Sequence, residues 1–460
     1  MKDTKWPIRN WVWGSVLIAV VCSAYVGIQN PAATLPNILV ILTDDQGYHD
    51  VSYYGTGDLR TPNIDGLAQT GMRFDNFYAN CTVCSPTRAA LLSGRFPDRV
   101  GVPGVIRTKP EDSWGYLDPK ATLLPAMLKK AGYHTAIVGK WHLGLASPNL
   151  PNEKGFDYFH GWLGDMMDDY VDKRRHGINY MRRNNQRIDP AGHATDLFTQ
   201  WATAFIRQEA ADKQPFLLYL AYNAPHLPVQ PPRHWVQKVK ARQPGLSDKR
   251  AELVALIEHM DDGIGQVIKA LKESGQYENT LIVFTSDNGG HLPSLANNGP
   301  VRDGKGSMYE GGLRVPTCVA WPGKVKSGSI SQQVNLTMDL YPTLLAVAGV
   351  KPNQPIEGRS FLPTLLGQSQ PEADRPLYFT RREGESSFAG QCSYALRLGN
   401  WKLVQNRPFS PLELYDVKTD SLEHRNLIKE QPDQHKKLAA LLMLHIQESG
   451  RVPWQQARAR

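Results

Sequence analysis

Two polar doublets, Asp44-Asp45 and Asp287-Asn288, are the first residues in this sequence whose types and placement could do chemistry. Each doublet follows an apolar run of strand length. Carboxylate and amide oxygens are the ligands that hard cations such as Ca²⁺ and Mg²⁺ take. A single doublet of this kind more often makes a turn or caps a helix. Two of them in the same setting favour a metal site over two unrelated turns.

Three cationic residues lie in segments punctuated by glycine or proline rather than on an amphipathic face. They are Arg88, Lys140 and Lys305. A lone lysine or arginine is usually a solvated surface charge. Each is therefore weak evidence by itself, and its weight comes from the other candidates.

Two histidines could act as a general acid or base. His142 stands two residues after Lys140, and His226 closes the sequence Asn-Ala-Pro-His just beyond a predicted strand. Imidazole exchanges a proton near neutral pH, as the hydrolysis of an ester requires. Either histidine could equally be a structural hydrogen-bonding residue.

The cysteines are few and scattered, at positions 22, 81, 84, 318 and 392. Such spacing over a long chain does not indicate a disulfide scaffold. Cys81 and Cys84 could form a redox pair or half of a zinc site. A zinc site needs a second Cys or His pair at matching spacing, and the sequence has none.

The elements that must position these residues are buried strands and covering helices. Residues 38–42 and 281–284 are continuous apolar runs, and 135–138 and 216–222 are further strand candidates. Strands that are apolar on both faces belong in a covered parallel sheet. Helical patterns at 123–131 and 251–274 alternate with them. We expect a large, mostly parallel α/β sheet flanked by helices, with ligands at the carboxyl ends of its strands.

The predicted pattern of strands and helices changes after about residue 370. Short strands are predicted at 393–398, 401–405 and 412–416, followed by a helix at 434–448. This pattern indicates a smaller α+β subdomain with a short antiparallel sheet. The expected division is 1–33 as signal or anchor, 34–370 as the α/β domain and 371–460 as the C-terminal subdomain. Residues 161–189 are expected to form a long loop, and loops of that length often bind ligands.

Composition excludes some classes of protein. The 460 residues are 41% hydrophobic and 21% charged, which indicates neither a disordered chain nor a multi-span membrane protein. The formal net charge of +8 comes from scattered residues, with no run of five basic side chains. A nucleic-acid partner is not expected, whereas an acidic small molecule or polysaccharide is compatible with this charge.

The N-terminus has the layout of an export signal. Lys2, Lys5 and Arg9 precede an apolar stretch at residues 11–28. Small residues after Cys22 allow cleavage, and the length also permits an uncleaved membrane anchor. The expected location is therefore outside the cytoplasm: periplasmic, extracellular, or anchored and facing outward.

Four ordered motifs give the sequence a close resemblance to a known family. They are Cys84-Ser85-Pro86-Thr87-Arg88; residues 132–144, which include Gly139-Lys140-Trp141-His142; residues 304–316, from Gly304-Lys305 to Val315-Pro316; and Asp339-Leu340-Tyr341-Pro342-Thr343. From about Asn37 to the C-terminal unit, the chain resembles the type I, formylglycine-dependent, arylsulfatase-like sulfatases of the alkaline phosphatase superfamily.

The resemblance implies roles for the candidate residues. Cys84 would be converted to formylglycine by a formylglycine-generating enzyme and would act as the nucleophile. One Ca²⁺, or Mg²⁺, would be held by Asp44, Asp45, Asp287, Asn288 and the modified Cys84. The sulfate would be surrounded by Arg88, Lys140, Lys305, His142 and His226.

The expected activity is hydrolysis of sulfate monoesters, with aryl sulfates as artificial substrates and sulfated carbohydrates as natural ones. In this scheme Lys140 and Lys305 neutralise the sulfuryl group, His226 or Lys305 protonates the leaving oxygen, and His142 takes the proton that releases sulfate. Two other functions stay open from the sequence. One is a phosphate or phosphonate ester hydrolase with the same metal core; the other is a silent binding protein for sulfated glycans.

Overall fold

A ten-stranded mixed sheet forms the centre of the fold. The computed structural model describes residues 1, 3, 35–371, 374–384, 388 and 390–455. The chain divides into residues 1–34 and a compact unit from 35 to 460, and the fold described here is that of the second. In order across the sheet, the strands are β11 (Ser329–Ser331), β2 (Met72–Phe74), β10 (Thr317–Ala320), β9 (Thr280–Ser286), β1 (Asn37–Thr43), β8 (Phe216–Ala221), β4 (His134–Lys140), β5 (Tyr158–Trp162), β6 (Met181–Arg183) and β7 (Gln186–Arg187).

The expected parallel arrangement holds for the five central strands, β9, β1, β8, β4 and β5. Antiparallel pairings occur toward the edges, where β10 pairs with both β9 and β2, and β6 pairs with both β5 and β7. The four strands predicted from apolar runs are β1, β9, β4 and β8, and all four lie in this centre. The α/β fold class is therefore confirmed.

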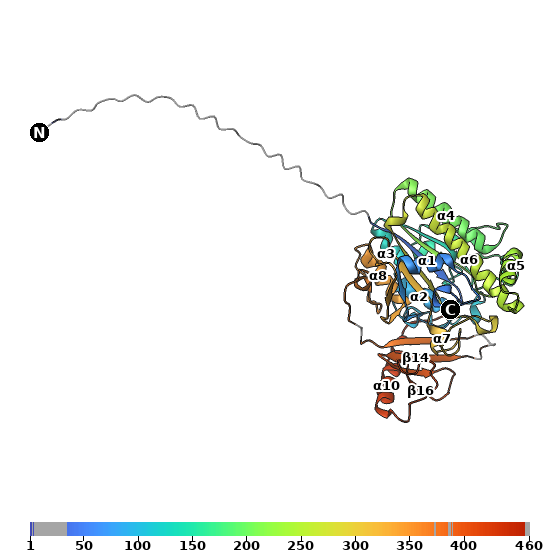
Figure 1. The fold of residues 1–460 in the computed structure, drawn as a ribbon. Coiled ribbons are helices and arrows are strands. Elements are labelled where there is room, and N and C mark those ends of the chain that lie inside the picture. The colour runs from blue at the N-terminus through green and yellow to red at the C-terminus, as the bar shows by residue number, and fades with distance from the viewer. Residues whose placement is uncertain (2, 4–34, 372–373, 385–387, 389, 456–460) are drawn as a thin grey trace, which may run out of the picture. The chain divides into compact units, whose positions relative to one another are not determined.

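Helices cover both faces of the sheet because the side chains of each central strand alternate between two cores. Leu39 and Ile41 of β1 pack toward one core, with α1 (Pro62–Thr70), α4 (Ala194–Asp212) and α6 (Asp248–Glu273). Val40 and Leu42 pack toward the other, with α2 (Cys84–Ser93), α3 (Leu124–Lys130) and α8 (Leu340–Val347). Figure 1 shows α4 and α6 on one side of the sheet and α3 and α8 on the other. The predicted helices at 123–131 and 251–274 correspond to α3 and α6.

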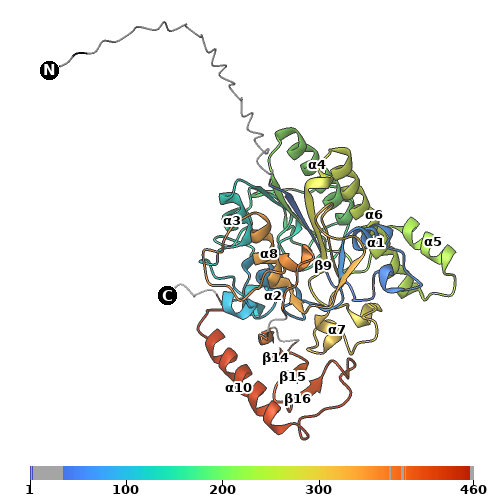
Figure 2. The ribbon, with the colours of Figure 1, turned by 60° about the vertical axis from the view of Figure 1, so that its left-hand side comes forward.

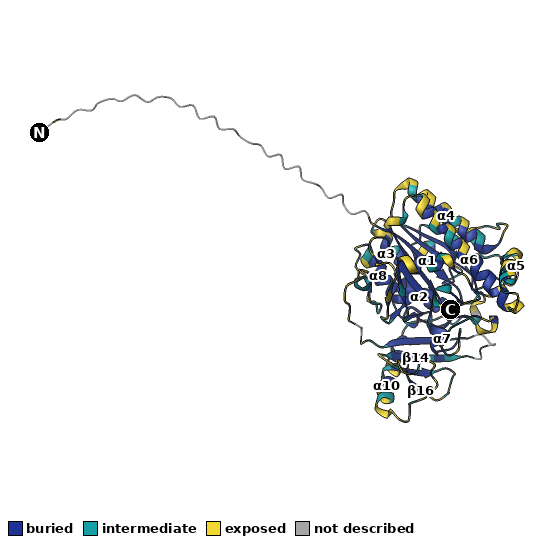
Figure 3. Ribbon diagram, in the orientation of Figure 1, coloured by how far each residue is buried: buried dark blue, intermediate teal, exposed yellow. Residues whose placement is uncertain are grey.

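The outer helices are amphipathic. α5 (Arg233–Arg242) packs on α6 through Val239, and most of its other side chains are partly or fully exposed. Figure 3 shows buried strands between helices that alternate buried and exposed residues. The remaining short elements are α7 (Glu310–Leu313), α9 (Leu362–Leu365) and a two-stranded sheet of β3 (Phe77–Tyr78) and β12 (Asn335–Leu336).

A second sheet lies toward the C-terminus, as Figure 2 shows. It is antiparallel, in the order β13 (Leu377–Arg382), β14 (Cys392–Leu398), β15 (Trp401–Gln405) and β16 (Glu413–Asp416), and α10 (Pro432–Ser449) packs on it. The sequence predicted three of these strands and the helix but missed β13. This sheet shares a core with Tyr78, Phe96 and Met308 of the preceding chain. The boundary predicted near residue 370 falls between α9 and β13.

Residues 161–189 are less irregular than expected. The segment begins inside β5, and β6 and β7 form a hairpin near its end. Residues 163–180 contain no helix or strand. The apolar stretch at residues 11–28 lies outside the described residues. Among those that are described, no helix combines the length and apolar character needed to cross a membrane.

Candidate active site

The register of β1 and β9 brings the two acidic doublets together. Thr43 pairs with Ser286, so the residues that follow each strand emerge side by side. The amide of Asp287 donates to the carbonyl oxygen of Thr43 at 3.1 Å, and the amide of Asp45 donates to Oδ1 of Asp287 at 3.2 Å. Asn288 Nδ2 donates to Oδ1 of Asp45 at 2.9 Å. The predicted convergence of the four polar residues is therefore observed.

Cys84 is the first residue of α2 and lies against this acidic group. Its thiol is only 3% exposed and donates to Oδ1 of Asp44 at 3.2 Å. Burial, with the negative charges of Asp287 and Asp44, raises the pKa of the Cys84 thiol well above its ordinary value, against the attraction of Lys140 and Lys305. An unmodified Cys84 is thus a protonated thiol at neutral pH, and a protonated thiol is a weak nucleophile.

Each of the three predicted cations pairs with a different carboxylate. Arg88 donates from Nε and Nη2 to Oδ2 of Asp287, at 3.1 and 2.6 Å. Lys140 Nζ lies 2.5 Å from Oδ2 of Asp44. Lys305 Nζ lies 2.7 Å from Oδ2 of Asp45. Three carboxylates therefore face three cationic groups, and this balance leaves no surplus positive charge for an anionic substrate.

The pKa values of the three carboxyl groups are shifted in different directions. Burial raises the pKa of Asp44, but the attraction of Lys140, with His226, Arg88 and Lys305, outweighs it and holds the pKa well below the usual range. Burial also raises the pKa of Asp45, but the attraction of His226 and Lys305 outweighs burial and lowers this pKa below its ordinary value. Burial and the like charge of Asp44 raise the pKa of Asp287 to about 7, despite the contact with Arg88. Placing three carboxylates this close is costly without further positive charge.

His226 and Lys305 are hydrogen-bonded to each other. The His226 Nδ1–H donates to the carbonyl oxygen of Leu227 at 2.8 Å, which leaves Nε2 to accept from Lys305 Nζ at 3.0 Å. Burial lowers the pKa of His226. In this arrangement the mobile proton resides on Lys305, whose pKa is raised by Asp45 and Cys84 against the effect of burial.

His142 is oriented as a proton acceptor. Its Nε2–H donates to the carbonyl oxygen of Ile106 at 3.0 Å, and its buried Nδ1 has no partner among the described residues. Burial, together with Lys140 and Arg88, lowers the pKa of His142 well below its ordinary value. The backbone at His142 is left-handed, with φ of 57°, as it is at Asp45, with φ of 66°. Strained residues of this kind gather at functional sites.

Comparison with known proteins identifies the family. The family model described as Sulfatase matches residues 36–350. The chain belongs to the sulfatase family. A second model, described as the C-terminal part of N-sulphoglucosamine sulphohydrolase, matches residues 303–450 of this sulfatase. It is therefore an enzyme that hydrolyses sulfate esters.

The sulfatase is similar to two mammalian sulfatases and to a solved structure over most of its length. It is 36% identical to the N-acetylgalactosamine-6-sulfatase of Mus musculus, covering 80% of this chain and 71% of that protein. It is 37% identical to the enzyme of the same name from Homo sapiens, covering 75% of this chain and 68% of that protein. Among solved structures, Ps i-CgsB in complex with k-i-k-neocarrahexaose superposes with a TM-score of 0.83 at 31% identity, covering 92% of this chain and 95% of that one.

The donor set of the sulfatase fits a hard divalent cation. Ligand atoms of Asp44, Asp45, Cys84 and His226 all lie within 4.8 Å of one another. The side-chain carbonyl oxygen of Asn288 is buried without a hydrogen-bond partner among the described residues. Such an orphaned oxygen costs free energy unless something satisfies it. A Ca²⁺ or Mg²⁺ ion would use this oxygen and relieve the repulsion that raises the pKa of Asp287.

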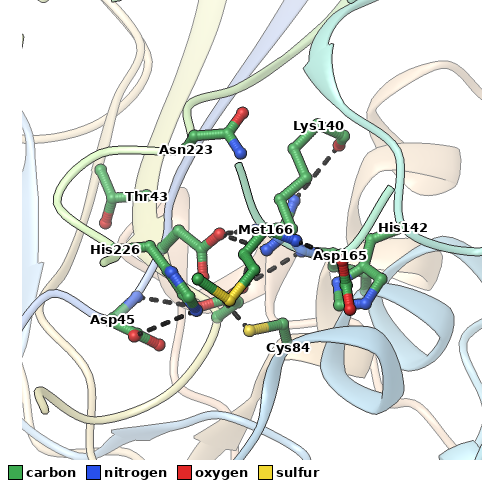
Figure 4. Close-up of polar contacts among 12 residues, drawn as sticks. Thr43, Asp45, Cys84, Lys140, His142, Asp165, Met166, Asn223 and His226 are labelled. Atoms are coloured by element: carbon green, nitrogen blue, oxygen red, sulfur yellow. Dashed lines mark hydrogen bonds and ion pairs between the residues drawn. The ribbon is translucent and has the colours of Figure 1, made fainter. Parts of the chain in front are cut away.

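Some residues of the site were missed by sequence reasoning. Figure 4 draws Asp165, Met166 and Asn223 around the same site as Cys84. Asn223 and Asp165 are 3% and 5% exposed, and Oδ1 of Asn223, like that of Asn288, is buried without a hydrogen-bond partner in the part of the chain that the structure describes. Asn223 stands three residues before His226 and two residues after the end of β8, so its position near the carboxyl end of a strand could have indicated it. Asp165 lies in the irregular segment after β5, where nothing in the sequence marks it.

The four described cysteines, at 81, 84, 318 and 392, are free thiols. The thiol of Cys81 donates to the carbonyl oxygen of Thr380 in β13 at 3.2 Å, whereas Cys84 contacts Asp44. Within the described residues, no cluster of potential metal ligands includes Cys81. The alternatives of a redox pair and of a zinc half-site therefore gain no support from the geometry.

Proposed function

We propose that this sulfatase uses a formylglycine made from Cys84, together with one divalent cation, to hydrolyse sulfate monoesters on carbohydrates. The observation that carries the proposal is the setting of Cys84, a buried thiol of raised pKa that lies 3.2 Å from Asp44. As a thiol it would attack slowly and would hold a captured sulfuryl group in a stable adduct. Hydrated formylglycine supplies one hydroxyl that displaces the alcohol from sulfur and a second whose deprotonation expels sulfate and restores the aldehyde.

The cationic side chains bind and orient the sulfate. Lys140 is buried beside Asp44 and Lys305 is partly buried beside Asp45, where they would meet the non-bridging oxygens of an entering sulfuryl group. Arg88 holds Asp287 from both Nε and Nη2 and so fixes the carboxylate group behind residue 84. Charged donors fixed in a buried site stabilise developing charge without reorganising, and each can contribute about 3–4 kcal/mol to the transition state.

Two separate groups handle the protons. The Lys305–His226 pair donates a proton to the departing alcohol oxygen, with Lys305 as the immediate source and His226 positioned 3.0 Å from it. His142 accepts, through its unpartnered Nδ1, the proton lost when sulfate is expelled. The hydrogen bonds of the two histidines leave a different nitrogen free to accept in each case: Nε2 of His226 accepts from Lys305, which is the proton donor, and Nδ1 of His142 accepts the released proton.

The residues that would hold the cation are Asp44, Asp45, Asp287 and Asn288, with residue 84 as a further ligand. The cation would supply positive charge that favours ionisation of a hydroxyl on residue 84 and stabilises negative charge on the sulfuryl oxygens. The buried, unpartnered Oδ1 of Asn288 and the raised pKa of Asp287 support this assignment.

The names of the relatives support a carbohydrate substrate. Two relatives at 36% and 37% identity are N-acetylgalactosamine-6-sulfatases, and a structure at 31% identity holds an oligosaccharide, k-i-k-neocarrahexaose. We therefore propose a sulfated sugar within an oligosaccharide as the substrate. N-acetylgalactosamine 6-sulfate and carrageenan oligosaccharides are the first compounds to assay, with p-nitrophenyl sulfate as the reporter.

Mass spectrometry of the proteolytic peptide that contains Cys84 tests the nucleophile. Protein co-produced with a formylglycine-generating enzyme should give a peptide mass that matches aldehyde in place of thiol, and Cys84→Ala should lose turnover of p-nitrophenyl sulfate. A fully active protein with an unmodified thiol would refute the proposal. Faster turnover of p-nitrophenyl phosphate than of the sulfate would favour a phosphate ester hydrolase instead.

We propose that the enzyme acts outside the cytoplasm, because the basic and apolar residues at 1–28 have the pattern of an export signal. Fractionation of cells that make the full-length chain tests this. Activity confined to the cytoplasmic fraction would contradict it.

A further inference from the structure

A cleft of about 440 Å³ lies between the main sheet's edge and the C-terminal sheet. It is lined on one side by residues such as Arg314 and Gln332, and on the other by β13, β14, the turn before β15 and the segment after β16. Its volume is within the range of small-molecule sites in proteins. None of the residues proposed to bind sulfate or the cation lines it.

The cleft is cationic. Arg314, Arg375, Arg397 and Lys418 line it, and no acidic side chain does so among the described residues. The nearby carboxylates are already engaged: Asp339 pairs with Arg375, and Glu310 accepts from Tyr78 at 2.7 Å and from Lys402 at 2.9 Å. A concave surface with one sign of charge focuses the field on an ion of opposite sign.

Several donors in the cleft are unused. Arg397 is 8% exposed and donates from Nε to Gly399 and from Nη1 to the hydroxyl of Tyr78, so its Nη2 has no acceptor in the described part of the chain. Arg314 donates from Nε and Nη2 to the backbone of Asp75, and its Nη1 is likewise without an acceptor there. A nearly buried guanidinium with an unused donor is suited to a ligand oxygen.

The lining also excludes one class of anion. No aromatic side chain lines the cleft, so it offers no surface on which a nucleotide base could stack. Instead, the amide of Asn400 lies beside the cations and can bond sugar hydroxyls, whereas the amide of Gln332 already donates to Asp75 at 2.7 Å and accepts from Asn76 at 3.2 Å. This combination of guanidinium, ammonium and amide groups matches an oligosaccharide that carries acidic substituents.

We propose that this cleft is a second binding site for sulfated oligosaccharides, holding an anionic group on a sugar remote from the ester being cleaved. The proposal rests on the proposed function, because it assigns a polyanionic carbohydrate as the substrate. The loop from Asp303 to Arg314 connects the two sites, since it carries Lys305 near one end and Arg314 at the other. Engagement of two sites on one chain raises affinity without changing the chemical step.

The test variant adds negative charge at the exposed rim and spares the three arginines that line the cleft. We would combine Asn400→Asp with Lys418→Glu, two exposed residues whose side chains form no hydrogen bond or ion pair with another described residue. For a sulfated octasaccharide, KM should rise about tenfold because charge-assisted contacts are lost, with kcat unchanged. For p-nitrophenyl sulfate, which is too small to reach both sites, both constants should match wild type. The matched control is Lys351→Glu, an exposed lysine after α8 that does not line the cleft.

Calorimetric titration with the same octasaccharide gives a readout independent of turnover. Weaker binding by the cleft variant, with normal binding by Lys351→Glu, supports the second site. Equal binding and equal KM in the two variants would overturn it. If the wild-type chain binds the octasaccharide at the cleft but hydrolyses no sulfate ester, the proposed function fails while the cleft remains a binding site.

Discussion

The hydroxyl of Tyr170 lies 2.9 Å from the carbonyl oxygen of His226, and it also lies 2.8 Å from that of Asn223. Tyr170 is 1% exposed and belongs to the irregular segment after β5. The hydroxyl of Tyr170 therefore bonds to both ends of the turn from Asn223 to His226 and holds this turn in position. In this way a residue without any contact to the reacting atoms fixes the position of His226 relative to Lys305.

Replacing Tyr170 by Phe should impair leaving-group protonation more than sulfate binding. We expect kcat for an alkyl or sugar sulfate to fall about tenfold, since misplacing a general acid forfeits part of a 10²- to 10⁴-fold effect. The loss for p-nitrophenyl sulfate should be smaller, because nitrophenolate leaves without full protonation. Steady-state kinetics with both substrates measures this difference.

The control for this prediction is Tyr222→Phe. Tyr222 is also fully buried, and its hydroxyl lies 2.8 Å from Oγ1 of Thr199, between α4 and β8. This variant loses one buried hydrogen bond but should keep the wild-type ratio of the two rates. An equal loss with both substrates in Tyr170→Phe would show a general structural effect and contradict the positioning role.

Removal of the cation should abolish activity. Treatment with EDTA should eliminate turnover, and Ca²⁺ or Mg²⁺ should restore it. Addition of the cation should also raise the midpoint of thermal unfolding, because a ligand that binds only the folded state stabilises it. Asn288→Ala, which removes the orphaned oxygen, should reduce this shift. Asn335→Ala, at an equally buried amide in β12, should leave it unchanged. Equal shifts in the two variants would contradict the ligand assignment.

Gly289 should not tolerate a side chain. A Cβ there would lie 1.8 Å from the carbonyl oxygen of Gly311, where the loops that carry Asn288 and Lys305 meet. Gly289→Ala should therefore destabilise the fold by about 1–3 kcal/mol or more and lower activity, as expected for overpacking. Gly66→Ala is the contrast, because a Cβ at this position in α1 meets no atom within 4 Å. It should be neutral or stabilise by about 0.5–1 kcal/mol. Urea unfolding measures both; comparable stability in the two variants would refute the steric argument.

The Asp98–His445 pair should make stability depend on pH in the acid range. Asp98 is buried, which raises its pKa, but the hydrogen bond from His445 Nε2 at 2.9 Å outweighs burial and lowers the pKa below its ordinary value. A lowered folded pKa means that the stabilisation is present above the unfolded value of about 3.9 and is lost as the pH falls through the folded value. The free energy of unfolding of Asp98→Asn should thus lie furthest below that of wild type above about pH 5, and the gap should narrow as the pH falls below about 4. A gap that widens on acidification would contradict this assignment.

The sequence by itself determined the central strands and the kinds of groups at the site. Runs that are apolar on both faces, such as residues 38–42, can be buried only in a covered sheet, and polar doublets directly after them must lie at its carboxyl edge. Four ordered motifs, of which one surrounds Cys84, were enough to indicate the family. These features depend on side-chain type and near neighbours along the chain, which a sequence shows directly.

Only the tertiary structure decided which charges pair and what holds them. Strand register set Asp44 beside Asp287, and packing paired Lys305 with Asp45, 260 residues away in the chain, rather than with another carboxylate. The local sequence likewise did not indicate the hydrogen bond from Tyr170 to His226, the strand β13 or the cationic cleft at Arg397. Such contacts join distant segments, and their energies depend on distances of a few ångströms that propensity and periodicity do not specify. The residue types of this sulfatase therefore indicate its chemistry, whereas the fold determines which residues contact one another.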